Sequence, residues 1–354
     1  MYATLAEWQS VVNAELERLL PREIKETYLV DFFGQANYNY DAVALQRALS
    51  TPIWTLLDRG GKRWRPAVFL LLIEAFGEDP YDYLPYACIP EILHTGTLIV
   101  DDVEDEAAMR RGGPALHHEY GTDMALNAGN AMYFLPLKII SQNPGNLDCE
   151  ERLTAYDMLM HELNRTHLGQ GMDIYWHNEK AVRVDEDQYF EMCACKTGCL
   201  ARIAAQLAAI VTNQDERITY HTAKYAELMS IAFQISDDIL DIENTLNDDD
   251  AFGKAFGNDI IEGKKTLMVI HAVNRGMPER AARLEDILWS SDNTREEIFE
   301  AIHILQDADS IEYAREQARE LAINARKHLE ILELDSDPAA HLREFTRFVV
   351  ERDT

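Results

Sequence analysis

The sequence has no hydrophobic run long enough to cross a membrane. Its longest apolar stretch, residues 67–73, ends at Glu74, whereas a transmembrane helix needs roughly 20 apolar residues. The first ten residues, MYATLAEWQS, also lack the basic segment followed by an apolar one that marks a secretory signal. We therefore expect a soluble, cytoplasmic protein without a transmembrane segment.

Glycine, proline and cysteine are all scarce. The 354 residues include 17 Gly and 11 Pro, and 47% are hydrophobic, so the chain can bury a large core and disorder is not expected. Its 5 cysteines are an odd number without paired Cys-x-x-Cys spacing, which argues against a disulfide framework and against a zinc site. We interpret the cluster Cys193, Cys195 and Cys199 as small buried residues of a helix.

Basic residues are few compared with acidic ones. There are 33 Lys and Arg against 62 Asp and Glu, which gives a formal net charge of -29 at pH 7. This charge disfavours nucleic acid or an anionic membrane as a partner. An anionic substrate could bind only where metal ions or a local cluster of Lys and Arg offset the negative charge of the Asp and Glu residues. The surplus of acid also suits a surface adapted to high salt.

Helical periodicity runs through the whole chain. Apolar residues recur at steps of three and four from Ile311 to Leu332, which places them on one face of a helix. The same spacing recurs in further stretches: residues 83–106, 123–142, 150–172, 188–212, 219–244 and 294–306. Glycine and proline fall between these stretches, and no run shows the alternation of a strand. We predict an all-α fold of many antiparallel helices that forms a single domain over residues 1–354.

Two acidic motifs of the form Asp-Asp-x-x-Asp each follow an apolar stretch. The first is Asp101-Asp102-Val103-Glu104-Asp105, and the second is Asp237-Asp238-Ile239-Leu240-Asp241. On a helix, the first and last Asp of each motif lie one turn apart on the same face, so their carboxylates can share hard divalent ions. Two such pairs facing each other would form a cage for magnesium.

Acidic runs are more often solvated surface than metal ligands. We interpret Asp248-Asp249-Asp250, in a polar segment, as such a surface. The two motifs differ because each caps an apolar helix expected to be buried, where uncompensated carboxylates are costly and counterions are implied. Magnesium retains several waters and completes its shell with phosphate oxygens. The motifs therefore predict a magnesium-bound diphosphate rather than a protein-only metal site.

Lys and Arg residues next to glycine supply positive charge at several places. The segment GGKRWRP, residues 60–66, is a glycine turn that leads into a helix, so backbone amides, a helix N-terminus and two cations can together bind a phosphate. Arg110 and Arg111 follow the first acidic motif closely enough to bind a metal-bound diphosphate. Further cations next to glycine are Lys196, Lys254, Lys264 and Lys265. Each is weak alone, but together with two Asp motifs they predict a diphosphate site.

These motifs resemble those of the trans-isoprenyl diphosphate synthases, also called polyprenyl synthases, over nearly the full length. The matching strings occur in the family's order: GGKRWRP, HTGTLIVDDVEDEAAMRRG, GQGMDIYW, KTGCL, FQISDDILD and GKAFGNDIIEGKKT. The chain looks most like the geranylgeranyl diphosphate synthases of the fungal and animal type. The resemblance implies the isoprenoid synthase fold, with antiparallel helices around a deep central active-site cavity, and a homodimer.

The resemblance also implies roles for residues at the matching positions. For isopentenyl diphosphate these are Lys62, Arg65, His94 and Arg111. For the allylic diphosphate, which can be dimethylallyl, geranyl or farnesyl diphosphate, they are Arg110, Lys196, Thr197, Gln234, Lys254 and Lys264. For magnesium they are Asp101, Asp105 and Asp237, with Asp102, Asp238 and Asp241 engaged directly or through water. The implied catalytic set is Asp101, Asp102, Asp105, Lys196, Asp237 and Asp238.

His94 has a second interpretation, as a core histidine satisfied by hydrogen bonds. It lies seven residues before Asp101, which is two turns along the same helix face, so it would line the same cavity. We therefore keep it among the residues expected to bind isopentenyl diphosphate.

The implied reaction is a magnesium-dependent, head-to-tail condensation of isopentenyl diphosphate with an allylic diphosphate. Magnesium and the cations stabilise the departing diphosphate, the allylic substrate ionises toward a carbocation, and the isopentenyl double bond attacks it. Loss of a proton to the released diphosphate completes one elongation. No protein nucleophile is needed.

Product length should depend on what blocks the cavity beyond the metals. Gly96 and Thr97, about one turn before the first motif, are small, which disfavours the short product of animal-type farnesyl diphosphate synthases. Tyr133, Phe134 and His167 match positions where fungal and animal geranylgeranyl diphosphate synthases carry bulky residues that floor the channel. Ordinary helix packing is the alternative interpretation of these three side chains. We expect geranylgeranyl diphosphate, with a longer polyprenyl diphosphate as the alternative.

Three other classes fit the sequence less well. A terpene cyclase shares the fold and the first Asp motif, but it normally lacks a segment like GGKRWRP, and its second metal motif is typically of the Asn/Ser/Glu kind. A catalytically silent synthase subunit tends to lose an Asp motif or the basic residues, and none is missing here. A helical di-metal carboxylate protein needs Glu-x-x-His pairs on facing helices, which His161 and Glu162 do not supply.

Overall fold

The computed structural model describes residues 2–179, 182–247, 257–290 and 292–351. Among these residues the only strands are the two-residue β1 (Met109–Arg110) and β2 (Gly113–Pro114), and helices make up most of the rest. The prediction of an all-α fold is confirmed.

The chain divides into two compact units. We call residues 2–70 and 79–156 the N-terminal unit, and residues 71–78 and 157–354 the C-terminal unit. The boundary between them falls within α5 (Trp64–Ala75) and within α9 (Cys149–Asn178). That residues 1–354 form a single domain remains a prediction.

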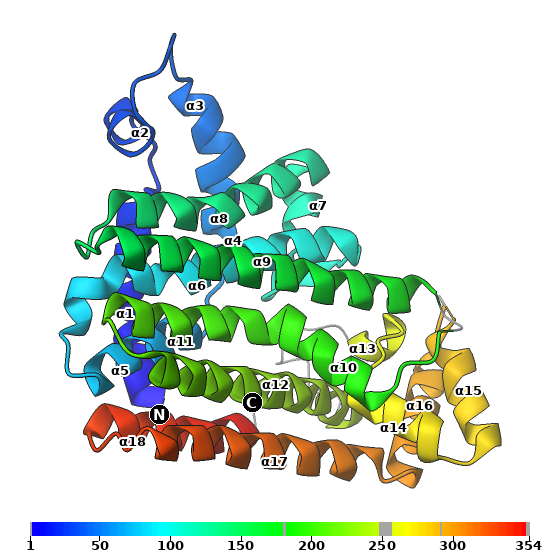
Figure 1. Cartoon of the computed structure of the whole chain (residues 1–354). Coiled ribbons are helices and arrows are strands. Elements are labelled where there is room, and N and C mark those ends of the chain that lie inside the picture. The colour runs from blue at the N-terminus through cyan, green and yellow to red at the C-terminus, as the bar shows by residue number, and fades with distance from the viewer. Residues whose placement is uncertain (1, 180–181, 248–256, 291, 352–354) are drawn as a thin grey trace. The chain divides into compact units, whose positions relative to one another are not determined.

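The N-terminal unit is built around α6 (Leu84–Glu104) and α8 (Thr122–Gln142), which pack against each other. The two helices, labelled in Figure 1, run antiparallel. Tyr86 near the start of α6 donates a hydrogen bond to Asn143 at the end of α8 (3.3 Å). The other elements of this unit are α1 (Tyr2–Leu19), α2 (Glu26–Phe33), α3 (Ala42–Leu45), the π-helical turn η1 (Gln46–Ser50), α4 (Thr51–Asp58), the 3-10 turn η2 (Pro80–Tyr83) and α7 (Leu116–Tyr120).

Two glycines allow α6 and α8 to approach closely. A Cβ at Gly96 of α6 would lie 2.7 Å from the Met132 Cβ and 2.9 Å from the Gly129 carbonyl oxygen. A Cβ at Gly129 of α8 would lie 2.8 Å from the Val100 Cγ2 atom. Real Cβ atoms do not tolerate such contacts, so Gly96 and Gly129 set the distance between α6 and α8. α6 carries the first acidic motif.

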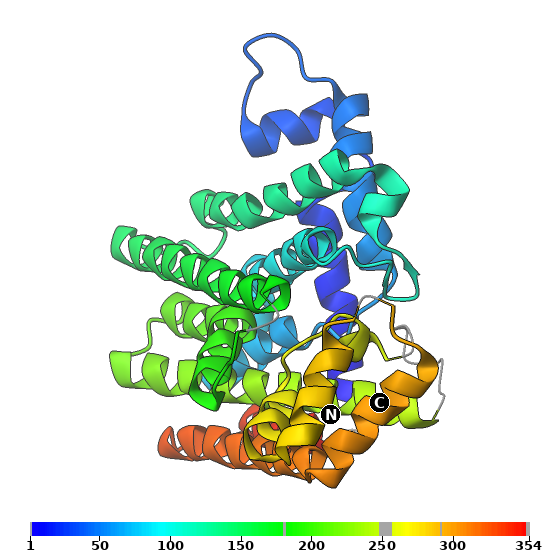
Figure 2. The same ribbon diagram turned by 90° about the vertical axis from the view of Figure 1, so that its right-hand side faces the viewer.

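The C-terminal unit is built around α12 (Glu216–Asn247), which packs mainly against α17 (Ser310–Ile331) and α11 (Cys199–Val211). α12 and α17 run antiparallel, since His221 contacts His328 at one end and Glu243 pairs with Arg315 at the other. The remaining elements are α10 (Glu186–Cys193), the π-helical turn η3 (Ala194–Gly198), α13 (Asn258–Ile261), α14 (Leu267–Arg275), α15 (Pro278–Leu288), α16 (Arg295–Asp307) and α18 (Asp337–Glu351). In Figure 2, α14, α15 and α16 face the viewer and pack against one another.

The helical stretches expected from apolar spacing match the observed helices closely. The stretch 83–106 corresponds to α6, for example, and 219–244 lies within α12. The stretch 188–212 differs in one respect, because a π-helical turn interrupts the α-helical pattern in its middle. This run starts at α10 with a capping box, in which the Asp185 and Gln188 side chains bond to each other's backbone N–H groups.

The same run, Glu186–Val211, is long and apolar enough to span a membrane by length and composition alone. In the structure, 83% of its 18-residue window is buried, as expected for the core helix of a soluble protein. The absence of a transmembrane segment remains a prediction.

Candidate active site

The first Asp motif ends α6 and contains two kinds of carboxylate. Asp102 is only 1% exposed, and the Arg110 Nε donates to its Oδ1 (2.6 Å). Asp101 and Asp105 are half-buried, and the Arg110 Nη2 lies 3.8 Å from the Asp101 Oδ2. Asp102 is therefore the residue that holds Arg110, while Asp101 and Asp105 remain accessible one turn apart.

The buried Asp102 carboxylate fits a cation. Burial raises the pKa of Asp102, and the positive charge of Arg110 offsets part of that rise. Its Oδ1 is paired with Arg110, whereas its buried Oδ2 accepts no hydrogen bond from a described residue, which leaves that oxygen able to accept from a metal-bound water. Within the described residues, no three His, Cys, Asp or Glu side chains form a metal site by themselves. The motif thus suits a hard ion that completes its shell with water and phosphate oxygens.

A β-hairpin directly after this motif presents Arg110 and Arg111. In the hairpin, β1 pairs with β2 in antiparallel register, with Arg110 opposite Gly113. The two turn residues, Arg111 and Gly112, have φ angles of 51° and 72°. A two-residue turn with positive φ at both positions matches the twist of the paired strands, so the turn places two cations side by side after the carboxylates.

Arg59 holds this hairpin in place, a role that the sequence analysis missed. Its Nη1 donates to the carbonyl oxygens of Arg110 (3.2 Å) and Pro114 (2.6 Å), and its Nη2 pairs with Glu119 (2.7 Å). A Cβ at Gly113 would lie 2.7 Å from the Arg59 Cζ, so the guanidinium packs directly against the backbone of the strand. The residue just before GGKRWRP thus connects that segment to the hairpin.

The glycine turn of GGKRWRP joins α4 to α5. Gly60 and Gly61 have φ angles of 95° and 137°, which residues with a Cβ rarely adopt. The Arg111 Nη1 donates to the Gly60 carbonyl (2.5 Å), and the Gln9 Nε2 of α1 donates to the Gly61 carbonyl (2.8 Å). Lys62, which follows the turn, is exposed. The structure thus brings Arg111 and the turn that carries Lys62 together.

Arg63 fixes the exit from this turn and was also not predicted. Its buried guanidinium pairs with Glu91 of α6 (2.7 Å) and donates to the Leu57 carbonyl (3.0 Å) and to Asn13 (3.1 Å). A Glu inside the apolar stretch of α6 is the signal that could have indicated a buried ion pair.

His94 lies among the arginines of these segments. Burial lowers the pKa of its imidazole well below the usual value, and the positive charges of Arg65, Arg111, Arg110 and Arg63 lower it further. The ring is therefore neutral at physiological pH. His94, Arg65 and Arg111, three of the residues predicted to bind isopentenyl diphosphate, are thus gathered in the N-terminal unit; that they bind this substrate remains a prediction.

The second Asp motif lies in α12, in the C-terminal unit. Its Asp238 is 2% exposed and is held by three donors, Lys264 (2.8 Å), Gln234 (2.9 Å) and Tyr189 (3.3 Å). Asp237 is half-buried. The second Asp of this motif is therefore paired with a cation, as is Asp102 in the first motif.

Asp241, the last residue of the motif, is also buried. Its Oδ2 accepts a hydrogen bond from the backbone N–H of Asp259 (3.2 Å), and the Asp259 carboxylate lies 3.8 Å from the Lys264 Nζ. Burial opposes the charged form of Lys264, but the carboxylates of Asp238, Asp259 and Asp173 outweigh it and raise its pKa well above the usual value. Lys264 is therefore charged at physiological pH.

Lys196 and Thr197 belong to the same cluster. The Lys196 Nζ pairs with Asp173 (2.6 Å), and the Thr197 hydroxyl donates to the Gln234 side chain (3.4 Å). The structure thus gathers Lys196, Thr197, Gln234 and Lys264 around the second motif, as the sequence predicts for one diphosphate. Lys254, predicted for the same role, lies outside the described residues. Asp173 was missed, although it stands in the motif GQGMDIYW.

The residues predicted to set product length lie in different surroundings. Gly96 faces α8, as described above, and the Thr97 hydroxyl donates to the His94 carbonyl (2.8 Å). Tyr133 is half-buried, Phe134 is 68% exposed, and His167 is exposed on α9. Their role in product length remains a prediction.

The chain is similar in sequence to known proteins. The family model described as polyprenyl synthetase matches residues 46–305. The chain is 36% identical to a geranylgeranyl pyrophosphate synthase of Geoglobus acetivorans over 297 residues, 84% of this chain and 88% of that protein. It is 32% identical to a geranylfarnesyl diphosphate synthase of Natronomonas pharaonis over 313 residues, 84% and 88% of the two chains.

A fungal relative and a solved structure agree with these matches. A geranylgeranyl pyrophosphate synthase of Penicillium janthinellum is 33% identical over 298 residues, which cover 82% of this chain and 75% of that one. The solved structure of the geranylgeranyl pyrophosphate synthetase of Geoglobus acetivorans is similar with a TM-score of 0.81 and 31% identity, over 98% of this chain and 99% of that chain.

Proposed function

This chain belongs to the polyprenyl synthetase family and has its isoprenoid synthase fold. We propose that it is a magnesium-dependent prenyltransferase, which condenses isopentenyl diphosphate head to tail with allylic diphosphates. One observation carries the proposal. In each Asp motif the second aspartate is buried and paired with a cation, Asp102 with Arg110 and Asp238 with Lys264, while the first aspartate stays half-buried. Carboxylates for metal and cations for phosphate therefore stand side by side.

The chain's own residues supply binding and orientation. Magnesium, when bound, neutralises the diphosphate and makes it a better leaving group. Arg110 and Lys264 are already held by carboxylates, so their charges need no rearrangement as negative charge develops on the leaving diphosphate. The raised pKa of Lys264 keeps its ammonium charged, and Lys196 with Thr197 adds a further donor pair beside it.

We propose geranylgeranyl diphosphate as the product. Two observations support this length: the small residues Gly96 and Thr97 precede the first motif, and relatives of Geoglobus acetivorans and Penicillium janthinellum carry that product in their names. The relative from Natronomonas pharaonis is named for a longer product, so a longer polyprenyl diphosphate is the second candidate.

We also propose that the protein acts as a cytoplasmic homodimer. Phe134 and Leu153 of the N-terminal unit are 68% and 60% exposed, and exposed large apolar side chains suit an interface with a second copy. Light scattering during size-exclusion chromatography should give twice the mass of the chain, and a monomer at all concentrations would contradict this proposal.

The activity is tested by incubating the purified protein with magnesium, labelled isopentenyl diphosphate and each of dimethylallyl, geranyl and farnesyl diphosphate in turn. The product alcohols are then resolved by chain length. We expect geranylgeraniol from every starter that is accepted. No condensation with any starter would contradict the proposal, and a cyclic hydrocarbon would indicate a terpene cyclase.

The proposed floor of the channel has its own test. Tyr133→Ala combined with His167→Ala should lengthen the product, because two bulky side chains are removed. An unchanged product length would show that these residues only pack between helices.

A further inference from the structure

Lys196 and Thr197 both lie in the π-helical turn η3 (Ala194–Gly198), in the middle of the continuous helical run from Glu186 to Val211. A π-helical turn replaces i→i+4 hydrogen bonds with i→i+5 bonds and disturbs the regular pairing of carbonyl groups. Buried carbonyl groups need donors from elsewhere when the helix does not supply them. The turn that carries two predicted allylic diphosphate ligands therefore depends on neighbouring side chains.

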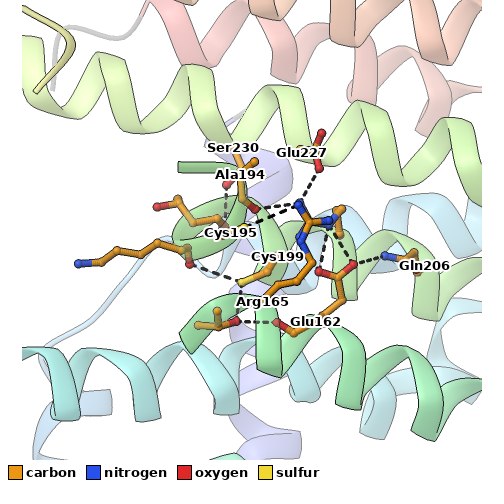
Figure 3. A network of polar contacts seen from close by, with 12 residues as sticks. Glu162, Arg165, Ala194, Cys195, Cys199, Gln206, Glu227 and Ser230 are labelled. Atoms are coloured by element: carbon orange, nitrogen blue, oxygen red, sulfur yellow. Dashed lines mark hydrogen bonds and ion pairs between the residues drawn. The ribbon is translucent and has the colours of Figure 1, made fainter. Parts of the chain in front are cut away.

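Side chains from other turns supply these donors. Three carbonyl oxygens of η3 accept hydrogen bonds, from the Arg202 Nη1 to Ala194 (2.8 Å), from the Cys199 Sγ to Lys196 (3.4 Å) and from the Ser230 Oγ to Thr197 (3.1 Å). Figure 3 shows Ser230 of α12 beside Ala194 and Cys195 of the turn. The backbone on both sides of the Lys196 side chain is thereby fixed from α11 and α12.

Arg202 is the central member of this group. It is 4% exposed, its Nε and Nη2 atoms donate to Glu162 of α9 (2.9 Å and 2.5 Å), and its Nη1 donates to Glu227 of α12 (2.5 Å). Gln206 donates to Glu162 (2.9 Å) and Lys224 to Glu227 (2.8 Å). Figure 3 shows Glu162, Gln206 and Glu227 converging from three helices. Two carboxylates and two cations therefore balance in charge.

A buried ionic network of this kind adds little net stability, because desolvation of the charges offsets their attraction. Its geometry is nevertheless strict, since a guanidinium has five donors in fixed directions. Arg202 uses these directions to join α9, α12 and the Ala194 carbonyl. The arrangement fixes where the π-helical turn lies between two helices.

α9 also approaches η3 directly at Lys196. A Cβ at Gly169 would overlap the Lys196 backbone nitrogen and would lie 2.8 Å from the Cys195 carbonyl carbon. One turn earlier on α9, Thr166 and Cys199 share a hydrogen bond (2.7 Å). The backbone of Lys196 is therefore confined by α9 as well as by the bonds from α11 and α12.

We propose that Arg202 is a positioning residue for the allylic diphosphate: held between Glu162 and Glu227, it fixes the π-helical turn and thereby the placement of the Lys196 ammonium and the Thr197 hydroxyl. This inference rests on the proposed function. Arg202 bonds to the backbone of the turn at the Ala194 carbonyl and would act on Lys196 and Thr197 through that backbone. Lys196 and Thr197 are predicted ligands of the allylic diphosphate and not of isopentenyl diphosphate, so a displaced turn should weaken binding of the allylic substrate alone.

The test compares steady-state kinetics of Arg202→Lys and Ser230→Ala with the wild type. Lysine keeps the charge but cannot reach both glutamates and the Ala194 carbonyl, and alanine removes only the donor to the Thr197 carbonyl. We expect the KM for the allylic diphosphate to rise roughly fivefold or more in each variant, the effect of about one lost hydrogen bond. The KM for isopentenyl diphosphate should stay within about twofold of the wild type. Ser230→Ala decides the question if Arg202→Lys does not fold.

Thr222→Val is the matched control. Thr222 is a fully buried residue of α12 whose hydroxyl bonds, within the described part of the chain, only to carbonyl groups of its own helix, so its loss should leave both KM values unchanged. The inference is overturned if Ser230→Ala and Arg202→Lys keep the wild-type KM for the allylic substrate, or if both substrates are affected equally. A wild-type protein that forms no product would instead contradict the proposed function itself.

Discussion

Within each motif, the first and second aspartates have the same side chain but different surroundings. Asp102 and Asp238 are buried and ion-paired, whereas Asp101 and Asp237 are half-buried. A buried carboxylate that holds a cation orients that cation, and a more accessible one can give its oxygens to a metal ion. The second Asp of each motif is therefore placed to orient the cation that it pairs with, Arg110 or Lys264.

His94 gives a prediction for the dependence of stability on pH. Its pKa in the folded state lies well below the usual value of 6.5, because the imidazole is desolvated and lies among arginines. Below pH 6.5 the unfolded chain binds a proton that the folded chain does not, so this group costs stability as the pH falls. His94→Gln should therefore lose less stability than the wild type between pH 7.5 and 5.5, by roughly 1 kcal/mol.

The measurement is the urea midpoint of unfolding at the two pH values. His303→Gln serves as the control, since His303 is exposed on α16 and its replacement should leave the pH dependence as in the wild type. Equal losses of stability in His94→Gln and the wild type would mean that His94 is protonated in the folded protein.

A single side chain, that of Arg59, holds the hairpin β1–β2 in place. Arg59 bonds to both strands and to Glu119, so Arg59→Gln should loosen the hairpin and move Arg110 and Arg111. We expect the KM for isopentenyl diphosphate to rise roughly tenfold, the equivalent of about 1.4 kcal/mol. Arg18→Gln, which removes an exposed arginine of α1, should not change this constant. An unchanged KM in Arg59→Gln would show that the hairpin keeps its place without the clamp.

The surroundings of Gly96 on α6 and of Gly171 on α9 predict opposite effects on stability for the two Gly→Ala substitutions. Gly96→Ala places a Cβ 2.7 Å from the Met132 Cβ and 2.9 Å from a backbone oxygen, so it should destabilise the protein by roughly 1–3 kcal/mol. Gly171→Ala on α9 meets nothing within 4 Å and should stabilise it by about 0.5–1 kcal/mol through helix propensity. Thermal unfolding of both variants gives the comparison. A Gly96→Ala protein as stable as the wild type would show that α6 and α8 can separate freely.

The helices could be predicted from the sequence, but the π-helical turn within the stretch 188–212 could not. Apolar spacing reveals α6, α12 and α17 because burial repeats along one face. A single π-helical turn changes that spacing by one residue, so η3 stays hidden among the apolar positions of 188–212. The sequence also does not reveal that Gly96 lies against α8, where a Cβ would meet Met132 and Gly129.

The residues of the candidate site that lie in short sequence motifs could be predicted from the sequence. Asp101, Asp237, Arg110 and Lys264 stand in such motifs. Arg59, Glu91 and Arg202 do not, because their roles depend on partners far away in the sequence, such as Glu162 for Arg202. Charged residues in apolar stretches are the signal that sequence reasoning can use for such pairs, yet the signal does not name the partner.

The net charge of -29 is a property of the whole molecule with a consequence for stability. Mutual repulsion of so many carboxylates opposes compaction, and salt screens it. The melting temperature should therefore rise by roughly 3–10 °C between 0.1 and about 2 M KCl. Replacing Glu296, Glu316 and Glu320, three exposed acids of α16 and α17, with Gln should make this dependence shallower. A melting temperature that is constant or falls with KCl would contradict the prediction.

The central claim is that the proposed condensation depends on magnesium and on both acidic motifs. Its most direct test is the rate at which labelled isopentenyl diphosphate enters product with magnesium present and with magnesium chelated. We expect product only with magnesium, and a loss of at least about a hundredfold in rate for Asp101→Asn and for Asp237→Asn, while Asp286→Asn, at an exposed position of α15, keeps the wild-type rate. Condensation that persists without divalent ions, or in a protein carrying both Asp101→Asn and Asp237→Asn, would contradict the account.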